Sequence, residues 1–334
     1  MSMPEPSLEP ASRIAPPAER FPAYPRAWLR FESARSLRRG PVSRDFCGRR
    51  VVVYRTEAGA LRALDARCLH LGSDLGRGRV EGDSIRCAFH GWRFDGQGRC
   101  THIPAQAVPP GCPTLASYPV EERAGGLYVF NGAQARYPLP FFADRAPEEL
   151  VPSRPYSVEL SCPWFMVGSN AFDLQHFRAA HDRVLRGPAE VRSSHPFART
   201  AAASFAVSGS GLRDGLTRAI SGDEVRLEIT DWCGSLLFAT ASFRRGKSYG
   251  LVAVTPLAGG RTRITVTVFV PKSAVPGLRG LLDAAHAAVR RFFILAFLAE
   301  DAKNLDGVRY NPEGLIEADR ELAEYFGWLA SISR

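Results

Sequence analysis

The sequence predicts an α+β protein: an N-terminal all-β domain, then a curved antiparallel sheet covered by helices. Three observations predict this. The chain of 334 residues is long enough for two domains. Short β-branched and aromatic runs, broken by Gly-rich turns, fill residues 46–131. The C-terminal half combines longer strand patterns with helical patterns, which is typical of a sheet that buries one face under helices.

The first domain is expected over residues 26–145. Its strands are predicted where β-branched and aromatic residues gather, at 50–54, 88–94 and 126–130. Turn residues separate them at 57–59, 82–83 and 95–98. A proline-rich stretch then predicts a linker or an edge segment, with Pro138, Pro140, Pro147, Pro152 and Pro155.

The second domain is expected over residues 146–334. A helix is predicted over about 167–180, a second one from Pro276 to about Asn304, and a last one over about 315–330. Between the first two, strands are predicted at 224–229, 236–243, 249–255 and 262–270. Gly259-Gly260 joins the last two strands as a hairpin.

The composition is that of a soluble globular protein, with 45% hydrophobic and 23% charged residues. The apolar run Phe292–Ala299 is shorter than the roughly 20 residues that a membrane span needs. Residues 1–25 are rich in Pro, Ala, Ser and Glu without an apolar core, so we expect a mobile tail and no secretion leader. The seven cysteines are scattered, which favours a reducing cytoplasm over a disulfide scaffold.

The net charge is +9, and arginines crowd the early part of the chain. They are Arg26, Arg30, Arg35, Arg38, Arg39, Arg44, Arg49, Arg50 and Arg55. Two interpretations stay open: a solvated face, or a docking surface for an acidic partner. No nucleic-acid recognition motif accompanies the charge, so we do not expect nucleic acid as a partner.

Two short motifs predict a first metal site. Cys68-Leu-His70 and Cys87-Ala-Phe-His90 each offer one thiolate and one imidazole, and two approaching loops could bring all four together. Such a set suits a 2Fe-2S cluster in which two histidines replace two cysteines on one iron. It also suits structural zinc, although zinc fingers usually pair cysteine with cysteine. Glycines in both loops would let backbone amides approach cluster sulfurs, which favours the cluster.

These motifs resemble the two cluster-binding loops of Rieske oxygenases, through Cys68-Leu-His70-Leu-Gly and Cys87-Ala-Phe-His90-Gly-Trp. The resemblance implies that Cys68 and Cys87 bind one iron and that His70 and His90 bind the other. It extends through residues 95–100. One departure is Ala88, where the family often has proline, and this change loosens the loop without removing a ligand.

A second metal site is predicted near Asp173, His176 and His181. The two histidines are five positions apart, so in an ideal helix they would diverge by about 140°. Both reach one metal only if the helix is bulged or ends there. Two histidines need a carboxylate to complete a facial triad on non-haem Fe(II). Glu300-Asp301, directly after an apolar run, is the best candidate, and Asp306 is the second choice.

The same resemblance covers this segment, which is similar to the Asp-x-x-His-x-x-x-x-His iron motif of the family. It implies His176, His181 and Asp301 as iron ligands. Asp173 would be an electron bridge between an iron-binding histidine of one subunit and a Rieske histidine of the next, with possible support from Asn170. The resemblance therefore implies a head-to-tail homotrimer. It also implies O2 as co-substrate and a ferredoxin or flavin reductase as electron donor.

The expected function is oxidation of a small hydrophobic molecule, aromatic or polycyclic, by hydroxylation or N-oxygenation. The chain resembles the compact homomeric branch of the family, which includes steroid and sterol enzymes and aminopyrrolnitrin-type arylamine N-oxygenases. Two other hypotheses stay open: a Rieske electron-transfer protein with an inactive second domain, and a zinc-stabilised binding protein. Several aromatic residues either line an apolar cavity or pack in the core, namely Phe172, Phe177, Trp232, Phe238 and Phe293.

Overall fold

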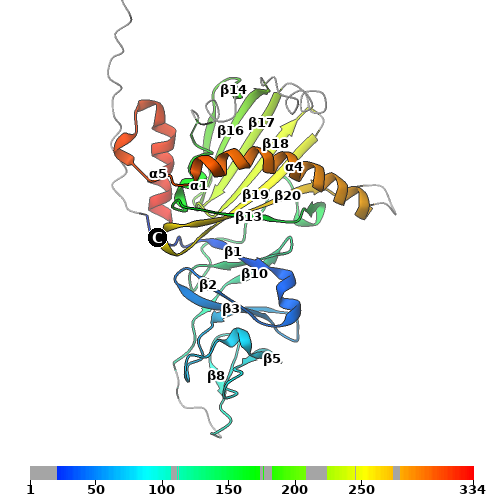
Figure 1. The fold of residues 1–334 in the computed structure, drawn as a ribbon, viewed down its shortest axis with the longest axis vertical. Helices are drawn as coiled ribbons and strands as arrows, with labels where there is room; N and C mark the ends of the chain where they lie inside the picture. The colour runs from blue at the N-terminus through cyan, green and yellow to red at the C-terminus, as the bar shows by residue number, and fades with distance from the viewer. Residues whose placement is uncertain are drawn as a thin grey trace, which may run out of the picture.

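The protein has two regions that follow one another along its longest axis (Figure 1). The computed structural model describes residues 21–106, 111, 113–173, 176, 183–207, 224–244, 246–273 and 279–334. Strands β1 to β11 form the lower region in that view, and strands β12 to β20 with helices α1, α4 and α5 form the upper one. The predicted α+β class is confirmed.

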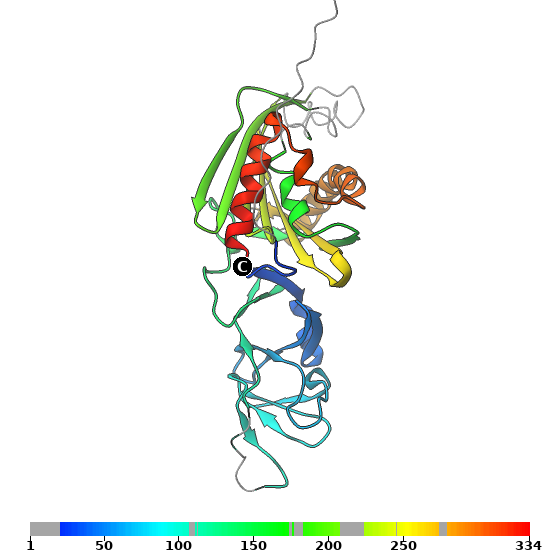
Figure 2. The ribbon, with the colours of Figure 1, turned by 90° about the vertical axis from the view of Figure 1, so that its left-hand side faces the viewer.

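Among the described residues of the N-terminal region, strands form three antiparallel sheets. Their orders are β1-β11-β10, β2-β3-β4-β9 and β5-β6-β7-β8. The β5–β8 sheet lies at the end farthest from the upper region (Figure 2). The strands are β1 (Trp28–Ser33), β2 (Val42–Phe46), β3 (Arg49–Arg55), β4 (Leu61–Asp65), β5 (Arg79–Glu81), β6 (Ser84–Arg86), β7 (Arg93–Phe94), β8 (Cys100–His102), β9 (Ser117–Tyr118), β10 (Val120–Arg123) and β11 (Gly126–Phe130).

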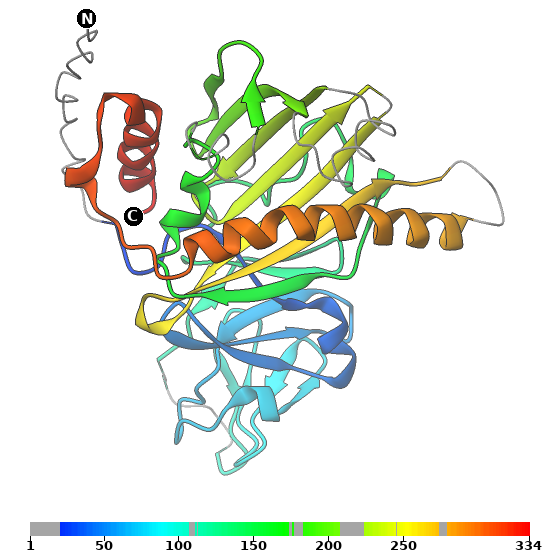
Figure 3. The same cartoon turned by 45° about the horizontal axis from the view of Figure 1, so that its top comes forward.

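Within the described residues, the C-terminal region is built on one nine-stranded sheet. Its main path runs β12-β20-β19-β18-β17-β16-β14; β13 also pairs with β20, and β15 with β16. Helix α4 (Arg279–Leu305) crosses one face of this sheet (Figure 3). The strands are β12 (Leu150–Pro152), β13 (Tyr156–Leu160), β14 (Arg183–Leu185), β15 (Glu190–His195), β16 (Ala198–Val207), β17 (Glu224–Trp232), β18 (Leu236–Phe243), β19 (Gly246–Pro256) and β20 (Thr262–Pro271).

Most predicted elements match the structure within a few residues, but three predictions are wrong in part. The helix expected over 167–180 is interrupted: α1 (Phe165–Ser169) ends early, residues 170–173 are not helical, and residue 176 is helical again, while residues 174–175 and 177–180 lie outside the described residues. The strand expected over 88–94 is a loop that ends in the two-residue β7. The last helix, α5, spans Arg320–Ile332, because residues 317–319 form a 3₁₀ turn before it.

A shared hydrophobic core joins the two regions. Trp28 and Phe130 from the first pack with Leu236 and Phe269 of the second, and all four are nearly fully buried. The proline-rich stretch contributes to this core, and the Trp28 Nε1–H donates to the Tyr137 carbonyl at 2.9 Å. That stretch also supplies strand β12 at the edge of the sheet. Pro152 is tolerated there because an edge strand has no second neighbour to which its missing N–H would donate. The domain boundary near residue 145 stays a prediction.

Residues 21–25, expected as part of a mobile tail, are packed instead. The Phe21 ring stacks on Phe165 of α1 with centroids 3.8 Å apart. The Trp164 indole N–H donates to the Pro22 carbonyl at 3.1 Å. The difference arises because Phe21 finds an aromatic cluster that the sequence pattern does not reveal. The rest of the expected tail, residues 1–20, lies outside the described residues.

Within the described residues, no helix is both long enough and apolar enough to span a membrane.

Candidate metal centres

Two loops with the same hydrogen-bond pattern carry the first four candidate ligands. The Cys68 carbonyl accepts the Gly72 N–H at 2.8 Å, and the Cys68 N–H donates to the carbonyl five residues on at 2.9 Å. The Cys87 carbonyl accepts the Gly91 N–H at 3.2 Å, and the Cys87 N–H donates in the same way at 2.8 Å. Gly72 and Gly91 have φ values of 72° and 73°, which residues with a Cβ adopt at a cost. The two halves of the site are therefore a matched pair of loops.

The two thiols point inward and the two imidazoles lie at the surface. Cys68 and Cys87 each expose only 3% of their area. His70 and His90 are exposed, and their ring centroids are 4.5 Å apart. A group that takes two thiolates on its buried side and two neutral nitrogens on its outer side fits this arrangement, and a Rieske 2Fe-2S cluster has that donor set.

Backbone amides stabilise the two thiolates to different degrees. Burial raises the pKa of the Cys68 thiol to about 11, although the His70 amide hydrogen-bonds its sulfur. At Cys87 burial also acts to raise the pKa, but two amides of its own loop and the Ser73 side chain outweigh it, so the pKa is lowered. Amide-to-sulfur hydrogen bonds favour the thiolate, which is the form that binds iron.

Aromatic rings flank both imidazoles. His70 stacks on Trp92 with centroids 4.9 Å apart and an interplanar angle of 2°. The Phe89 ring lies 3.9 Å from that of His90 and is 62% exposed. These contacts hold the orientation of the two rings without closing their outer edges.

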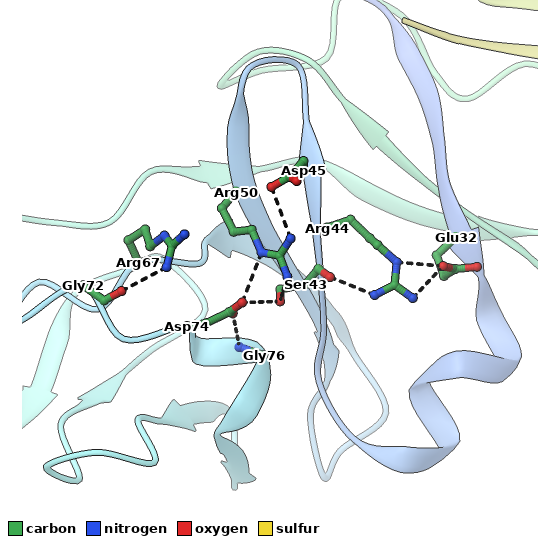
Figure 4. Close-up of polar contacts among 9 residues, drawn as sticks. All are labelled: Glu32, Ser43, Arg44, Asp45, Arg50, Arg67, Gly72, Asp74 and Gly76. Atoms are coloured by element: carbon green, nitrogen blue, oxygen red, sulfur yellow. Dashed lines mark hydrogen bonds and ion pairs between the residues drawn. The ribbon is translucent and has the colours of Figure 1, made fainter. Parts of the chain in front are cut away.

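Asp74 fastens the first loop to the neighbouring sheet (Figure 4). Its Oδ1 accepts the Gly76 N–H at 2.8 Å, while its Oδ2 accepts from Ser43 Oγ at 2.8 Å and from Arg50 Nε at 3.1 Å. Burial acts to raise the pKa of Asp74, but these bonds lower it overall. Sequence reasoning missed this network. An Asp two residues before a Gly is a known turn pattern that could have indicated it.

The second candidate centre joins two residues that are far apart in the chain. The His176 Nε2 lies 2.8 Å from the Asp301 Oδ1, and the two side chains are 13% and 16% exposed. Two donors at right angles on one metal, each about 2.1 Å away, would be roughly 3 Å apart. The hydrogen bond to Asp301 raises the pKa of His176 against the effect of burial. The pair therefore fits two adjacent ligands of one ion.

Asp173 caps the backbone beside this pair. Its Oδ1 accepts the His176 N–H at 3.0 Å. A side chain that accepts from the N–H three residues on is an N-cap. The prediction that Asp173 and His176 share one helix face is therefore wrong. The physical reason is that α1 ends at Ser169, before Asp173.

The structure does not bring the other described candidate residues to the His176–Asp301 pair. Asp306 is engaged elsewhere, because its Oδ1 accepts the Ser161 N–H at 2.7 Å. Glu300 is exposed, and Asn170 ends α1. His181 lies outside the described residues. Within the described part of the chain, no three His, Cys, Asp or Glu side chains are placed to hold one metal ion.

The proposed aromatic lining is mostly core. Phe172 and Phe238 are 1% and 4% exposed, and Trp232 packs partly buried against the shared core. Phe177 lies outside the described residues, and nothing is described of the Phe293 side chain.

The comparisons with known proteins agree with the first centre. Residues 27–119 match the Rieske [2Fe-2S] domain family. The chain is 44% identical over 117 residues to the oxygenase component of 3-ketosteroid-9-alpha-monooxygenase from Rhodococcus rhodochrous, covering 34% of this chain and 30% of the relative. It is 34% identical over 169 residues to cholesterol 7-desaturase of Bombyx mori, covering 49% and 37%. The matched part is thus about a third of the length of these curated relatives.

Among solved structures, dicamba monooxygenase with non-haem iron and dicamba has the same fold. The TM-score is 0.63 at 18% identity, and the match covers 92% of this chain and 97% of that one. The chain therefore combines a Rieske [2Fe-2S] domain with the fold of dicamba monooxygenase. The predicted resemblance is confirmed for the Rieske domain.

Proposed function

We propose that this chain is the catalytic subunit of a Rieske oxygenase that oxidises a hydrophobic small molecule with O2. The observation that carries the proposal is the close approach of His176 and Asp301 in a domain separate from the Rieske domain. A Rieske domain alone would serve an electron carrier equally well. A zinc-stabilised binding protein would need no second donor pair.

Two sets of residues would hold the metals. Cys68, Cys87, His70 and His90 would hold the 2Fe-2S cluster, and His176, His181 and Asp301 would hold a mononuclear Fe(II). When bound, the cluster supplies single electrons and the Fe(II) supplies the chemistry of O2 activation.

The protein's own contribution at the second centre is orientation and exclusion of water. The contact between Asp301 and His176 places the two donor atoms side by side, and the low exposure of both side chains keeps bulk water from competing for the same positions. Asp173 fixes the His176 backbone through its Oδ1. The exposed edges of His70 and His90 can face a partner surface.

We further propose Asp173 as the electron bridge between subunits, supported by its direct attachment to the His176 segment. A carboxylate between two metal-bound imidazoles orients both and raises their basicity. This role requires a homotrimer that brings the two cluster-binding loops of another subunit close to Asp173. Light scattering should then give three times the 36.6 kDa chain mass.

The proposed substrate is aromatic or polycyclic, and the reaction is hydroxylation or N-oxygenation. Two relatives are named for steroid or sterol substrates, which favours a polycyclic molecule. One is named as an oxygenase component, which supports a separate electron donor of the ferredoxin or flavin reductase type. A cytoplasmic location stays part of the proposal.

The test combines spectroscopy, metal analysis and turnover. The isolated protein should be reddish-brown, contain acid-labile sulfide with iron in excess of the cluster, and oxidise steroids, arylamines or aryl ethers in the presence of a reductase. A colourless protein that contains zinc would contradict the proposal. A Rieske spectrum without iron at the second centre would favour the electron carrier.

A further inference from the structure

A buried carboxylate and a buried phenol lie behind the segment that carries Asp173 and His176. Asp231 of β17 and Tyr325 of α5 are each 0% exposed. The Tyr325 hydroxyl donates to the Asp231 Oδ2 at 2.7 Å, and the Gly234 N–H donates to the Oδ1 at 2.8 Å. A polar pair in an apolar core is costly unless its hydrogen bonds are satisfied, so this pair is a built feature of the core.

The pair contacts the candidate iron segment through one ring. Tyr325 stacks on Phe172 with centroids 4.3 Å apart and an interplanar angle of 15°. Phe172 directly precedes Asp173, which caps the His176 N–H. The Tyr325 ring is thus the surface on which this part of the iron segment rests.

Gly168 shows how close the packing is. A Cβ on Gly168 would lie 2.1 Å from the Tyr325 hydroxyl oxygen and 3.1 Å from the Asp231 Oδ2. Helix α1 therefore passes directly over the hydrogen bond, and a glycine is needed there. The same short stretch of chain is contacted twice, at Gly168 by the hydroxyl and at Phe172 by the ring.

We propose that the Asp231–Tyr325 hydrogen bond positions the iron segment by fixing the ring against which Phe172 packs. Apolar packing alone lets an aromatic ring slide in its own plane, whereas an O–H···O bond sets both the distance and the direction of the ring axis. Asp231 and Tyr325 act on the iron segment through Phe172, so they are positioning residues. The inference rests on the proposed function of His176 as an iron ligand.

The test compares two Tyr→Phe variants. Tyr325→Phe keeps the stacked ring and removes the hydroxyl. Tyr249→Phe is the matched control, because Tyr249 is also 0% exposed and its hydroxyl also donates to a carboxylate, Asp144, at 3.1 Å. Tyr249 packs in the other core cluster, which does not contain Phe172.

The measurements are release of the mononuclear iron to a chelator, the EPR signal of its nitric oxide adduct, and hydrogen exchange of the His176 amide in iron-free protein. Tyr325→Phe should release iron about tenfold faster, the size of effect that outer residues have on metal sites. It should also split the nitric oxide signal into several species and speed the amide exchange. Tyr249→Phe should match the wild type in all three measurements. Asp231→Asn still offers the Tyr325 hydroxyl an acceptor oxygen, so it should retain most of the wild-type behaviour.

Equal effects of the two Tyr→Phe variants would overturn the proposal, since they would report only a loss of general stability. Wild-type iron release and amide exchange in Tyr325→Phe would overturn it too. If Tyr325→Phe does not fold, Phe172→Leu replaces it, because this change removes the stack and leaves the hydrogen bond. Absence of a nitric oxide signal in the wild type would instead refute the proposed function, so the two failures are distinguishable.

Discussion

The His176 Nε2 lies 2.8 Å from the Asp301 Oδ1, although the two residues are 125 positions apart in the chain. One belongs to the segment after α1 and the other to the last turns of α4. Neither element alone could hold a metal, and their meeting depends on how α1 and α4 pack on the sheet.

Replacement of His176 or Asp301 tests this pair as iron ligands. His176→Ala and Asp301→Ala should each lose the mononuclear iron and all oxygenation, because a facial triad with one ligand missing holds Fe(II) poorly. The Rieske absorption should stay unchanged. Asp306→Ala is the control, since Asp306 already binds the Ser161 amide. If Asp306→Ala loses iron and Asp301→Ala retains it, the assignment of the carboxylate is wrong.

Cys68→Ser tests the independence of the two centres. The variant should lack acid-labile sulfide and the Rieske spectrum but still bind one iron per chain at the second centre. The reason is that the four cluster ligands lie on two loops of the N-terminal region, whereas His176 and Asp301 lie in the C-terminal region. Iron and sulfide analysis measures both. Cys162→Ser is a suitable control, because Cys162 is buried in a core cluster of the C-terminal region that contains neither Cys68 nor Cys87. Full sulfide in Cys68→Ser would refute its role as a ligand.

Asp173→Asn tests the proposed electron bridge. Asn can still accept the His176 N–H, so the cap and both metals should survive. The amide lacks the charge and the second acceptor oxygen that a bridge between two imidazoles needs. We expect reoxidation of the reduced Rieske cluster to slow by at least about tenfold. The rate is measured by rapid mixing of the reduced protein with substrate and O2. A wild-type rate, or loss of the mononuclear iron, would show that Asp173 is not the bridge.

Asp231 predicts a pH dependence of stability. Burial raises the pKa of this carboxyl to about 7, although the Tyr325 hydroxyl and the Gly234 amide act to lower it. The folded state therefore holds this proton longer than the unfolded state, whose carboxyl titrates near 4. Stability should fall as the pH rises from about 4 to about 7, by on the order of 4 kcal/mol in the free energy of unfolding.

Asp231→Asn should remove that part of the pH dependence. The variant should gain stability relative to the wild type between pH 5 and pH 8, measured by denaturant unfolding. Asp144→Asn is the control with the opposite sign: burial acts to raise the pKa of Asp144, but Lys247 and Tyr249 lower it overall. Parallel stability curves for Asp231→Asn and the wild type would show that Asp231 does not titrate in this range.

Much of the local structure follows from the sequence. Strand β11 and strand β18 were predicted with the bounds that the structure has, because residue types and turns determine such strands over short distances. The interruption of the helix expected over 167–180 could not be predicted. Its periodicity continued, but the structure ends α1 at Ser169 and uses Asp173 as a cap before the helical residue His176.

By itself, the sequence determined the residue types and spacing of the cluster loops, since each Cys–His pair and its glycine lie within a few residues of one another. Only the tertiary structure decided among Glu300, Asp301 and Asp306. These three side chains leave α4 and its end in different directions, and packing on the sheet brings Asp301 alone to His176. The Asp231–Tyr325 pair, 94 positions apart, is likewise a product of packing, because long-range contacts depend on how whole elements assemble and leave no local pattern in the chain.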